Sequence, residues 1–307
     1  MAKAKAEAVG TRRCGFVALL GAPNAGKSTL LNALVGAKVS IVTPKVQTTR
    51  NLVRGIAIAG DTQAVFIDTP GIFDPKRRLD RAMVAAALAS AADADIVALL
   101  VDAKKGLDEE TRAIIAKLGA VPREKILILT KIDLMPRETL LALAKEANEL
   151  LPFERTFMIA AKNGDGVADV LDFFAARLPP GPWHYPADEI SDLPLRLMAA
   201  EITREKLYLR LHQELPYQST VETDSWKELA DGSVRIEQSI YVERDNQRKI
   251  VLGEGGRMIK AISTEARKEI AEAVERKVHL FLHVKVREDW GEDPERYRAA
   301  GLEFPKE

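Results

Sequence analysis

A glycine-rich loop between two apolar segments constrains the fold of this chain more than any other feature. The loop, GAPNAGKSTL at residues 21–30, follows the apolar run GFVALL (15–20) and leads into LNALVG (31–36). Gly21 and Gly26 let the backbone curl until successive N–H groups point inward, where they can meet phosphate oxygens. The helix that follows adds its partial positive charge at the same place. The order strand, loop, helix is the one that a phosphate-holding loop requires, and it implies an α/β fold.

Apolar runs recur along the first half of the chain and alternate with helical patterns. Most of these runs are solidly apolar, which is typical of strands covered on both faces. We predict a P-loop domain with a six-stranded, mostly parallel, doubly wound sheet, in which the second and third strands form an antiparallel hairpin. The predicted strands are residues 15–20, 52–60, 63–68, 95–102, 125–130 and 156–160, and the predicted helices are 27–36, 80–92, 108–119, 136–151 and 166–178.

A proline-rich segment separates this domain from a second one. Five prolines fall in LPPGPWHYPADEISDLP (178–194), a density that no helix or strand carries. Beyond it the pattern predicts a helix (about 196–214), strands at 217–230 and 232–244, a helix–GEGG–helix unit at 248–275 and a strand at 277–287. The predicted organisation is a basic extension (1–12), a first domain (13–178), a linker (179–195), a smaller α+β domain (196–290) and a partly ordered tail (291–307).

Composition excludes several classes of protein. The chain carries 45 basic and 45 acidic side chains, so no overall charge directs it to nucleic acid. Its one cysteine, Cys14, cannot form an internal disulfide framework, and no apolar run is long enough to span a bilayer. We therefore expect a cytoplasmic protein without a transmembrane segment.

Four short motifs follow one another at the ends of the predicted strands. The first is the phosphate loop, where Lys27 is placed to bridge β- and γ-phosphates and Ser28 to ligate Mg²⁺. DTPG (68–71), TKID (130–133) and AAK (160–162) follow in order. Each motif is weak by itself, but four in this order indicate a guanine-nucleotide site at the carboxyl edge of the sheet.

The later motifs divide the nucleotide between them. Asp68 can hold Mg²⁺ through water, the Gly71 N–H can meet the γ-phosphate, and Asp133 can accept hydrogen bonds from the guanine ring. The Lys131 stem covers the base, and the Ala161 N–H lies near the guanine oxygen. The residues predicted to bind GTP or GDP are Gly21, Asn24, Ala25, Gly26, Lys27, Ser28, Thr29, Asp68, Gly71, Thr130, Lys131, Asp133, Ala161 and Lys162.

These motifs, together with QTTR (47–50) and GEGGRMIKAISTEARKEI (253–270), make the chain similar to the translation-factor-like GTPases and, among them, to the Era family of bacterial ribosome-assembly GTPases. The resemblance covers nearly the whole chain. It implies GTP hydrolysis, Mg²⁺ as cofactor, a C-terminal KH domain of type II, and binding near the 3′ end of 16S rRNA during maturation of the 30S subunit. It also marks residues 39–51 as switch I and 71–80 as switch II, with Thr49, or alternatively Thr48, as a second Mg²⁺ ligand beside Ser28 and Asp68.

Two positions depart from the pattern of the family, and a third bears on catalysis. The family usually has Asn where Thr130 stands and Ser where Ala160 stands, so we expect weaker orientation of the base loop without loss of specificity. Ras-like GTPases orient the attacking water with a glutamine at the position of Ile72, which cannot do so. The resemblance implies that Asn24 instead helps hold a K⁺ ion beside the phosphates. The predicted catalytic groups are Lys27, Thr49, Gly71 and Asn24.

The GEGG sequence at 253–256 matches the GXXG loop with which KH domains approach single-stranded RNA. Six basic residues lie between positions 248 and 268 against two acidic ones, which favours contact with phosphates. Glu254 and Gly255 stand where many family members carry a basic residue, so we expect weaker phosphate affinity there. Apolar residues at 250–252, 258, 259 and 262 are expected to form the core and a groove floor. The residues predicted to contact RNA are Arg248, Lys249, Gly253, Glu254, Gly255, Gly256, Arg257 and Lys260.

Two other functions share parts of this pattern. A P-loop ATPase or kinase uses the same phosphate loop, although TKID argues against it. An RNA-binding clamp with negligible turnover is compatible with Ile72. Peripheral contact with the inner membrane occurs in the family, and here only Lys3, Lys5, Arg12 and Arg13 point to it.

Overall fold

The computed structural model describes residues 12–212, 215–288 and 290–305. The chain divides into two compact units. Of the described residues, unit 1 comprises 12–38, 54–69 and 88–191, and unit 2 comprises 39–53, 70–87, 192–212, 215–288 and 290–305. Within unit 2, the two switch segments predicted from the sequence therefore group with the C-terminal part of the chain. Most of the predicted basic extension, including Lys3 and Lys5, lies outside the described residues.

Unit 1 is built on the predicted six-stranded sheet, with strand order β2-β3-β1-β4-β5-β6. The central strands β1 (Arg13–Leu20), β3 (Thr62–Asp68), β4 (Ile96–Asp102) and β5 (Glu124–Thr130) pair in parallel, and β6 (Arg155–Met158) extends the same direction. Every residue of β3 and β4 is buried, as expected of strands covered on both faces. The fold class predicted from the solid apolar runs is confirmed.

The exception to the parallel pattern is β2 (Val53–Ala59), which lies next to β3. Only Gly60 and Asp61 connect the two strands, and a connection this short joins antiparallel neighbours. Gly60 has a φ of 58°, as a tight hairpin turn requires. The predicted hairpin is therefore present.

Five helices accompany this sheet close to the predicted positions: α1 (Lys27–Val35), α2 (Arg78–Asp93), α3 (Glu109–Leu118), α4 (Arg137–Leu150) and α5 (Val167–Arg177). α1 and α5 contact each other and β3. Asp108 begins α3 because its side chain accepts a hydrogen bond from the Thr111 N–H, a standard N-cap. The short turn η1 (Ile132–Leu134) lies between β5 and α4.

The proline-rich segment forms no helix or strand before Pro194, yet it is fastened along its length to the sheet of unit 1. The Cys14 N–H donates to Pro179 O at 3.1 Å, and the Ile56 N–H donates to Ile190 O at 2.9 Å. Between these points, the buried Gln63 amide accepts hydrogen bonds from the N–H groups of His184 and Tyr185 at 2.9 and 3.0 Å. The segment is a docked strap over the edge of β1, β2 and β3.

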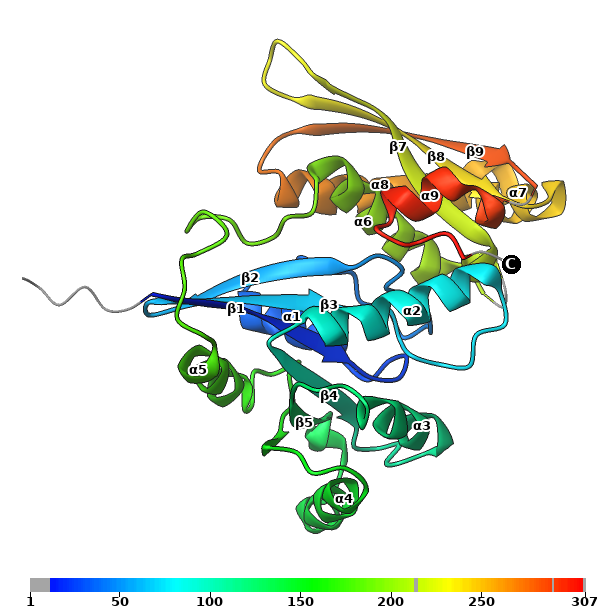
Figure 1. The fold of residues 1–307 in the computed structure, drawn as a ribbon. Coiled ribbons are helices and arrows are strands. Elements are labelled where there is room, and N and C mark those ends of the chain that lie inside the picture. The colour runs from blue at the N-terminus through cyan, green and yellow to red at the C-terminus, as the bar shows by residue number, and fades with distance from the viewer. Residues whose placement is uncertain (1–11, 213–214, 289, 306–307) are drawn as a thin grey trace, which may run out of the picture. The chain divides into compact units, whose positions relative to one another are not determined.

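Unit 2 contains the predicted KH domain. Its sheet has the order β7-β8-β9, with β7 (Ser219–Glu228) antiparallel and β9 (Val278–Val286) parallel to β8 (Val234–Val242). Helices α6 (Leu195–Arg210) and α8 (Arg257–Ala273) pack against each other and the sheet, and α7 (Asp245–Leu252) precedes α8 (Figure 1). The order α6-β7-β8-α7-α8-β9 is that of a type II KH domain, as predicted.

The predicted tail contains a short helix. After the turn η4 (Trp290–Glu292), helix α9 (Pro294–Ala299) begins at Asp293, whose side chain accepts from the Glu295 N–H. Tyr297 and Leu302 are buried with Ala82 and Met83 in one apolar cluster of unit 2. Two side chains of this charge-rich segment thus contribute to the core of unit 2.

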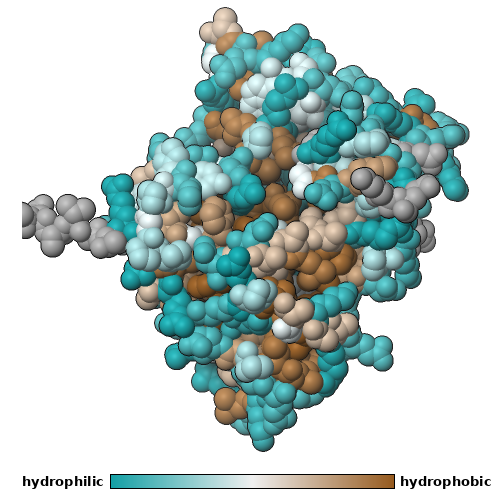
Figure 2. Space-filling model, viewed as in Figure 1, coloured by the Kyte–Doolittle hydropathy of each residue, from teal (hydrophilic) through white to brown (hydrophobic). Residues whose placement is uncertain are grey.

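The surface has the mixed character of a globular protein. Figure 2 shows polar residues over much of the face drawn, with apolar residues in scattered areas. Large apolar side chains that are exposed include Leu141 (69 %) and Leu134 (56 %), which is ordinary for single surface residues. Among the described residues no helix is long and apolar enough to cross a membrane.

Candidate functional site

The phosphate loop of unit 1 has the backbone that the sequence predicts. Gly21 has a φ of 150° and Gly26 a φ of 96°, and Asn24 between them has a φ of 63°. A Cβ on Gly21 would lie 2.4 Å from Leu100 O, which no structure tolerates. Only glycine fits at this point, because the loop passes directly over the end of β4.

Lys27 and Ser28 begin the helix after the loop. The Lys27 ammonium donates to Gly21 O at 3.1 Å and to Ala22 O at 3.0 Å, so the side chain folds back over the loop. Burial lowers the pKa of Lys27 to about 8, against the opposing influence of Asp68. A buried cation of this kind gains strongly from a phosphate placed beside it.

The Ser28 hydroxyl donates to Asp68 Oδ2 at 2.6 Å. Asp68 ends β3 opposite Leu19 of β1, so the register of two parallel strands brings the carboxylate to the helix N-terminus. Hydroxyl and carboxylate oxygens are the ligands that Mg²⁺ prefers, so this pair fits the predicted cofactor. No cluster of three or more His, Cys, Asp or Glu capable of holding a metal occurs in the part of the chain that the structure describes.

Thr130 and Lys131 tie the base loop to the phosphate loop. The Thr130 hydroxyl donates to Ala25 O at 2.8 Å, and the Lys131 ammonium donates to Asn24 O at 2.7 Å and to Asp102 Oδ2 at 2.6 Å. Lys131 has a φ of 59°, uncommon for a residue with a side chain, and these bonds hold it there. The substitution of Thr for the usual Asn therefore keeps a link between the two loops.

The remaining base-loop residues lie close together in unit 1. The Ile132 N–H donates to Ile159 O at 3.3 Å, which joins the TKID and AAK segments. Asp133 is exposed, Ala161 is half-buried and Lys162 is exposed. Ala160 is buried, and its N–H donates to Asp165 O at 3.0 Å. Asp133 is thus exposed, and its contact with guanine stays a prediction.

The switch residues belong to unit 2. Thr49 is 9 % exposed. The Thr48 hydroxyl, its predicted alternative, lies 2.6 Å from Thr43 Oγ1 and donates to Lys45 O at 2.7 Å. The Thr48 hydroxyl is therefore engaged within the switch I loop. Gly71 and Ile72 are both buried, and Ile72 is 1 % exposed, so its side chain serves packing.

The GEGG loop of unit 2 contains three glycines with positive φ: Gly253 (71°), Gly255 (59°) and Gly256 (76°). A Cβ on Gly253 would lie 2.7 Å from the Cβ of Met258, so this glycine is required for α7 and α8 to meet. A Cβ on Gly255 would meet nothing within 4 Å. The tip of the loop is therefore open to a close approach by another backbone.

The basic residues around this loop are exposed but paired. Asp245 lies 3.4 Å from Arg248 and 3.2 Å from Lys249, and Glu254 pairs with Arg257. Exposed pairs of this kind contribute little free energy, so phosphates can compete for the basic groups. The predicted basic face considered residues 248–268 and therefore did not include Asp245, which precedes them. Lys260 is exposed on the first turns of α8.

The apolar residues predicted to form the core and a groove floor divide between buried and exposed positions. Val251 and Ile262 are fully buried, with Met258 and Ile259 partly buried against them. Ile250, however, is 54 % exposed. Successive residues of a helix point about 100° apart, so Ile250 can lie outside the core that Val251 enters.

Sequence reasoning missed a cluster of buried arginines in unit 2. Arg50, directly after Thr49, donates to Tyr208 Oη at 2.7 Å and to Ser219 O at 2.9 Å. Arg204 of α6 is 1 % exposed and donates to Glu201 Oε1 at 2.9 Å. The QTTR motif contains Arg50, but a charge in a polar loop gives no signal of burial; only the packing shows it.

Comparison with known proteins places these sites in a family. A model of the family described as "50S ribosome-binding GTPase" matches residues 16–131, and one described as "KH domain" matches residues 214–291. GTPase Era of Bradyrhizobium sp. strain BTAi1 is 67 % identical over 295 residues, covering 96 % of each chain. GTPase Era of Rhizobium meliloti strain 1021 is 64 % identical over 294 residues, covering 96 % of this chain and 94 % of its own.

Two solved structures agree over nearly the whole chain. A crystal structure of Era in complex with MgGDPNP and nucleotides 1506–1542 of 16S ribosomal RNA superimposes with a TM-score of 0.90 at 36 % identity, covering 94 % of this chain and 99 % of that one. A variant of Aquifex aeolicus Era bound to GDP·AlF4⁻ gives a TM-score of 0.89 at 36 % identity, with the same coverage. The phosphate loop lies within the residues that the GTPase model matches and the GEGG loop within those that the KH model matches, and the chain belongs to the Era family of GTPases.

Proposed function

We propose that this GTPase is a switch that binds 16S rRNA near its 3′ end through the GEGG loop and acts in maturation of the small ribosomal subunit. The related Era bound to MgGDPNP and nucleotides 1506–1542 of 16S rRNA supports the RNA assignment. The family description that mentions the 50S subunit covers only residues 16–131, whereas that complex spans both units, so we give the small subunit more weight. The observation that carries the nucleotide assignment is the Ser28–Asp68 contact at 2.6 Å beneath the glycine loop.

In this proposal the chain holds the triphosphate by charge and by backbone N–H groups. Lys27 neutralises the β- and γ-phosphates, and the N–H of Gly71 meets the γ-phosphate. Ser28, Thr49 and Asp68 hold Mg²⁺, which neutralises the charge that develops on the phosphate oxygens during transfer. Because there is no covalent intermediate to form, these residues act by positioning and by electrostatic stabilisation.

Guanine is selected by the base loop. Asp133 accepts two hydrogen bonds that adenine cannot donate, and the Ala161 N–H meets the guanine oxygen. Lys131 is held by Asp102 at 2.6 Å with its stem available to cover the base. The family consists of GTPases, so the assignment argues against an ATPase or a kinase. It argues for the same reason against an RNA-binding clamp that does not hydrolyse GTP.

Ile72 leaves this chain without a side chain to orient the attacking water. We assign part of the missing stabilisation to K⁺ held beside Asn24, in the role that an arginine finger plays elsewhere. The test is single-turnover hydrolysis in K⁺ and Na⁺ buffers, in which we expect faster turnover with K⁺. Equal rates in the two buffers would remove Asn24 and K⁺ from the mechanism.

The RNA assignment is tested by crosslinking to cellular RNA with GTP or GDP bound. Gly255→Asp adds a negative charge at the tip of the GEGG loop, where its Cβ meets nothing within 4 Å. Gly232→Asp, at the β7–β8 turn with a φ of 78° and similarly open space, is the matched control. We expect crosslinks at the 16S 3′ end to be lost only in Gly255→Asp, and unaltered crosslinks in that variant would separate the GEGG loop from the function.

The RNA that the protein binds indicates where it acts. Ribosomal RNA is assembled in the cytoplasm, so we place the protein there. Peripheral contact with the inner membrane remains a prediction that depends on the N-terminal basic residues, of which Arg12 and Arg13 are described.

A further inference from the structure

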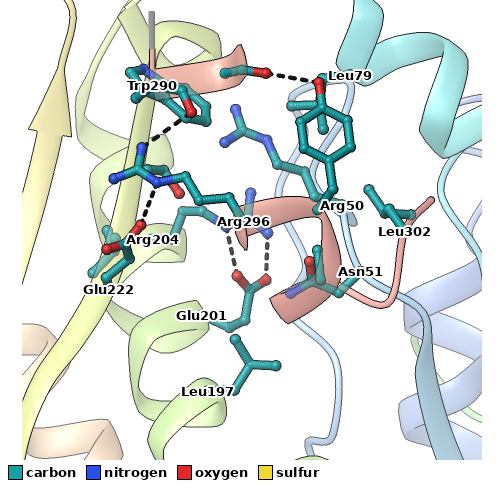
Figure 3. Close-up of a pocket in the computed structure, with 15 residues that line it drawn as sticks. Arg50, Asn51, Leu79, Leu197, Glu201, Arg204, Glu222, Trp290, Arg296 and Leu302 are labelled. Atoms are coloured by element: carbon teal, nitrogen blue, oxygen red, sulfur yellow. Dashed lines mark hydrogen bonds and ion pairs between the residues drawn. The ribbon is translucent and has the colours of Figure 1, made fainter. Parts of the chain in front are cut away.

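Unit 2 contains a cavity that no step of the proposed GTPase cycle or of RNA binding uses. Its volume is about 140 Å³, comparable to a cavity that accommodates benzene in another protein. Residues from three segments meet around it: Arg50 of the switch I loop, Arg204 of α6 and Arg296 of α9 (Figure 3). We call it the arginine cavity.

Two guanidinium groups in this cavity have hydrogen-bonding capacity left over. Among the described residues, Nη1 of Arg204 and Nη2 of Arg296 are buried without a hydrogen-bond partner. The other nitrogens of Arg204 are used, since Nε donates to Glu201 and Nη2 donates to Thr48 O at 2.5 Å. Buried donors without a partner are costly, and a site with two of them favours an occupant that brings acceptors.

The charges around the cavity sum to a single positive charge. Three arginines line it, and two carboxylates, Glu201 and Glu222, are paired with them. Glu201 binds Arg204, and Glu222 Oε1 lies 2.7 Å from Arg296 Nε. A ligand with one negative charge would therefore compensate the one guanidinium that has no carboxylate partner in this lining.

Burial lowers the pKa of two of the three arginines, Arg50 and Arg296, whereas the ion pair with Glu201 outweighs desolvation and raises the pKa of Arg204. Desolvation lowers the pKa of Arg50, and the nearby charge of Arg204 lowers it further. Desolvation also lowers the pKa of Arg296. Stacking of Arg50 on Trp290, with its guanidinium carbon 5.4 Å from the ring centroid, offsets part of this cost.

The rest of the lining is apolar. Leu79, Leu197, Val221, Ala300 and Leu302 contribute aliphatic surface, and the ring of Trp290 completes it. A hydrated dianion such as phosphate would lose its water shell against this wall without matching charge. A carboxylate on a compact apolar body satisfies both parts of the cavity.

We propose that the arginine cavity is a binding site for a small organic carboxylate of about the size of benzoate, held by Arg204 and Arg296. The occupant's carboxylate accepts from Nη1 of Arg204 and Nη2 of Arg296, and its body contacts the apolar wall. The proposal goes beyond the proposed GTPase function and does not depend on it, because it concerns only residues around this cavity.

The test is calorimetric titration of the full chain, saturated with GDP and Mg²⁺ so that the nucleotide site is occupied. Benzoate is compared with benzamide, its neutral counterpart of equal size. We expect benzoate to bind with one-to-one stoichiometry and at least roughly tenfold more tightly than benzamide, since charge-assisted hydrogen bonds are about twice as strong as neutral ones. Fluorescence of Trp290, removed in Trp290→Phe, gives a local readout.

Two filling variants locate the site. Ala300→Leu and Leu197→Phe occupy the cavity from different segments, and each is expected to weaken benzoate binding roughly tenfold or more. Ala230→Leu, on the exposed β7–β8 turn, is the control and should bind as wild type does. The proposal is overturned if wild type shows no binding at about 10 mM benzoate, if benzamide binds equally well, or if both filled variants retain wild-type affinity.

Discussion

The molecule has two glycine loops that are suited to phosphates, and they are built in opposite ways. The phosphate loop of unit 1 is enclosed: Lys27 is 6 % exposed, and a Cβ on Gly21 would overlap Leu100 O at 2.4 Å. The GEGG loop of unit 2 is open at Gly255, where a Cβ would meet nothing within 4 Å. One loop encloses a ligand of fixed shape, whereas the other leaves room for a polymer backbone that must slide into place.

The difference extends to how charge is held. Lys27 is buried and directed by two loop carbonyls, so its charge awaits one partner. The basic residues near GEGG are exposed and already paired with Asp245 and Glu254, so they can exchange one partner for another. An enclosed site provides specificity, and an open site provides affinity that depends on salt.

The largest expected effect tests the enclosure directly. Gly21→Ala should lower GDP affinity by up to roughly 100-fold, because the loop must move away from β4 and a strained backbone costs about 1–3 kcal/mol. Gly255→Ala should leave GDP affinity unchanged and lower stability by about 1 kcal/mol, the cost of a side chain at positive φ. Calorimetry and thermal unfolding measure both, and equal losses of GDP affinity would abolish the contrast between the loops.

A second prediction concerns the bond that joins the base loop to the phosphate loop. Thr130→Val removes the hydroxyl that donates to Ala25 O, and leaving that buried carbonyl unpaired costs about 1–3 kcal/mol. GDP affinity should therefore fall by roughly tenfold. Thr139→Val, which removes an exposed local hydrogen bond to Pro136 O, is the control. Unchanged affinity in Thr130→Val would mean that the loops are held independently.

A smaller effect is expected at the open loop. Glu254→Lys removes the partner of Arg257 and adds a cation, so RNA affinity should rise severalfold. The slope of log affinity against log salt should steepen by about 0.7 for each added phosphate contact with a single strand. Glu272→Lys, near the far end of α8, should change neither quantity. If both variants raise RNA affinity equally, the gain comes from net charge and not from the loop.

The smallest effect is expected in the strand beneath the phosphate loop. Cys14 of β1 is 5 % exposed, and burial raises the pKa of its thiol, which keeps it protonated. Iodoacetamide at pH 8 should label it only at the rate of unfolding, while amide hydrogens at the GEGG loop exchange readily. Labelling of Cys14 as fast as a free thiol would show that the enclosed loop rests on a sheet that opens.

The sequence predicted correctly those features that depend on residues close together in the chain. The phosphate loop, DTPG and TKID each lie at the end of a parallel strand, and the ends of such strands meet at one edge, so Ser28 and Asp68 could be placed together in advance. The hairpin before Asp68 and the type II order of the KH elements followed from runs and turns in the same way.

The sequence did not predict which side chains are buried where burial depends on packing between segments that are distant in the chain. Nothing local distinguishes Arg50 from other charges in a polar loop, yet it is buried against Tyr208, far along the chain. Tyr297 and Leu302 could not be recognised as core because their partners, Ala82 and Met83, lie in another helix.

The strap over the edge of the first sheet has a practical consequence. Its five prolines suggest a vulnerable connection, but Gln63 and Ile56 hold it at His184, Tyr185 and Ile190. A protease needs an extended, detached stretch of backbone in its cleft, so digestion should spare this region even though it lacks helix or strand. A truncated protein for biophysical work should accordingly end after Ser191, so that the fragment keeps the strap that seals its sheet.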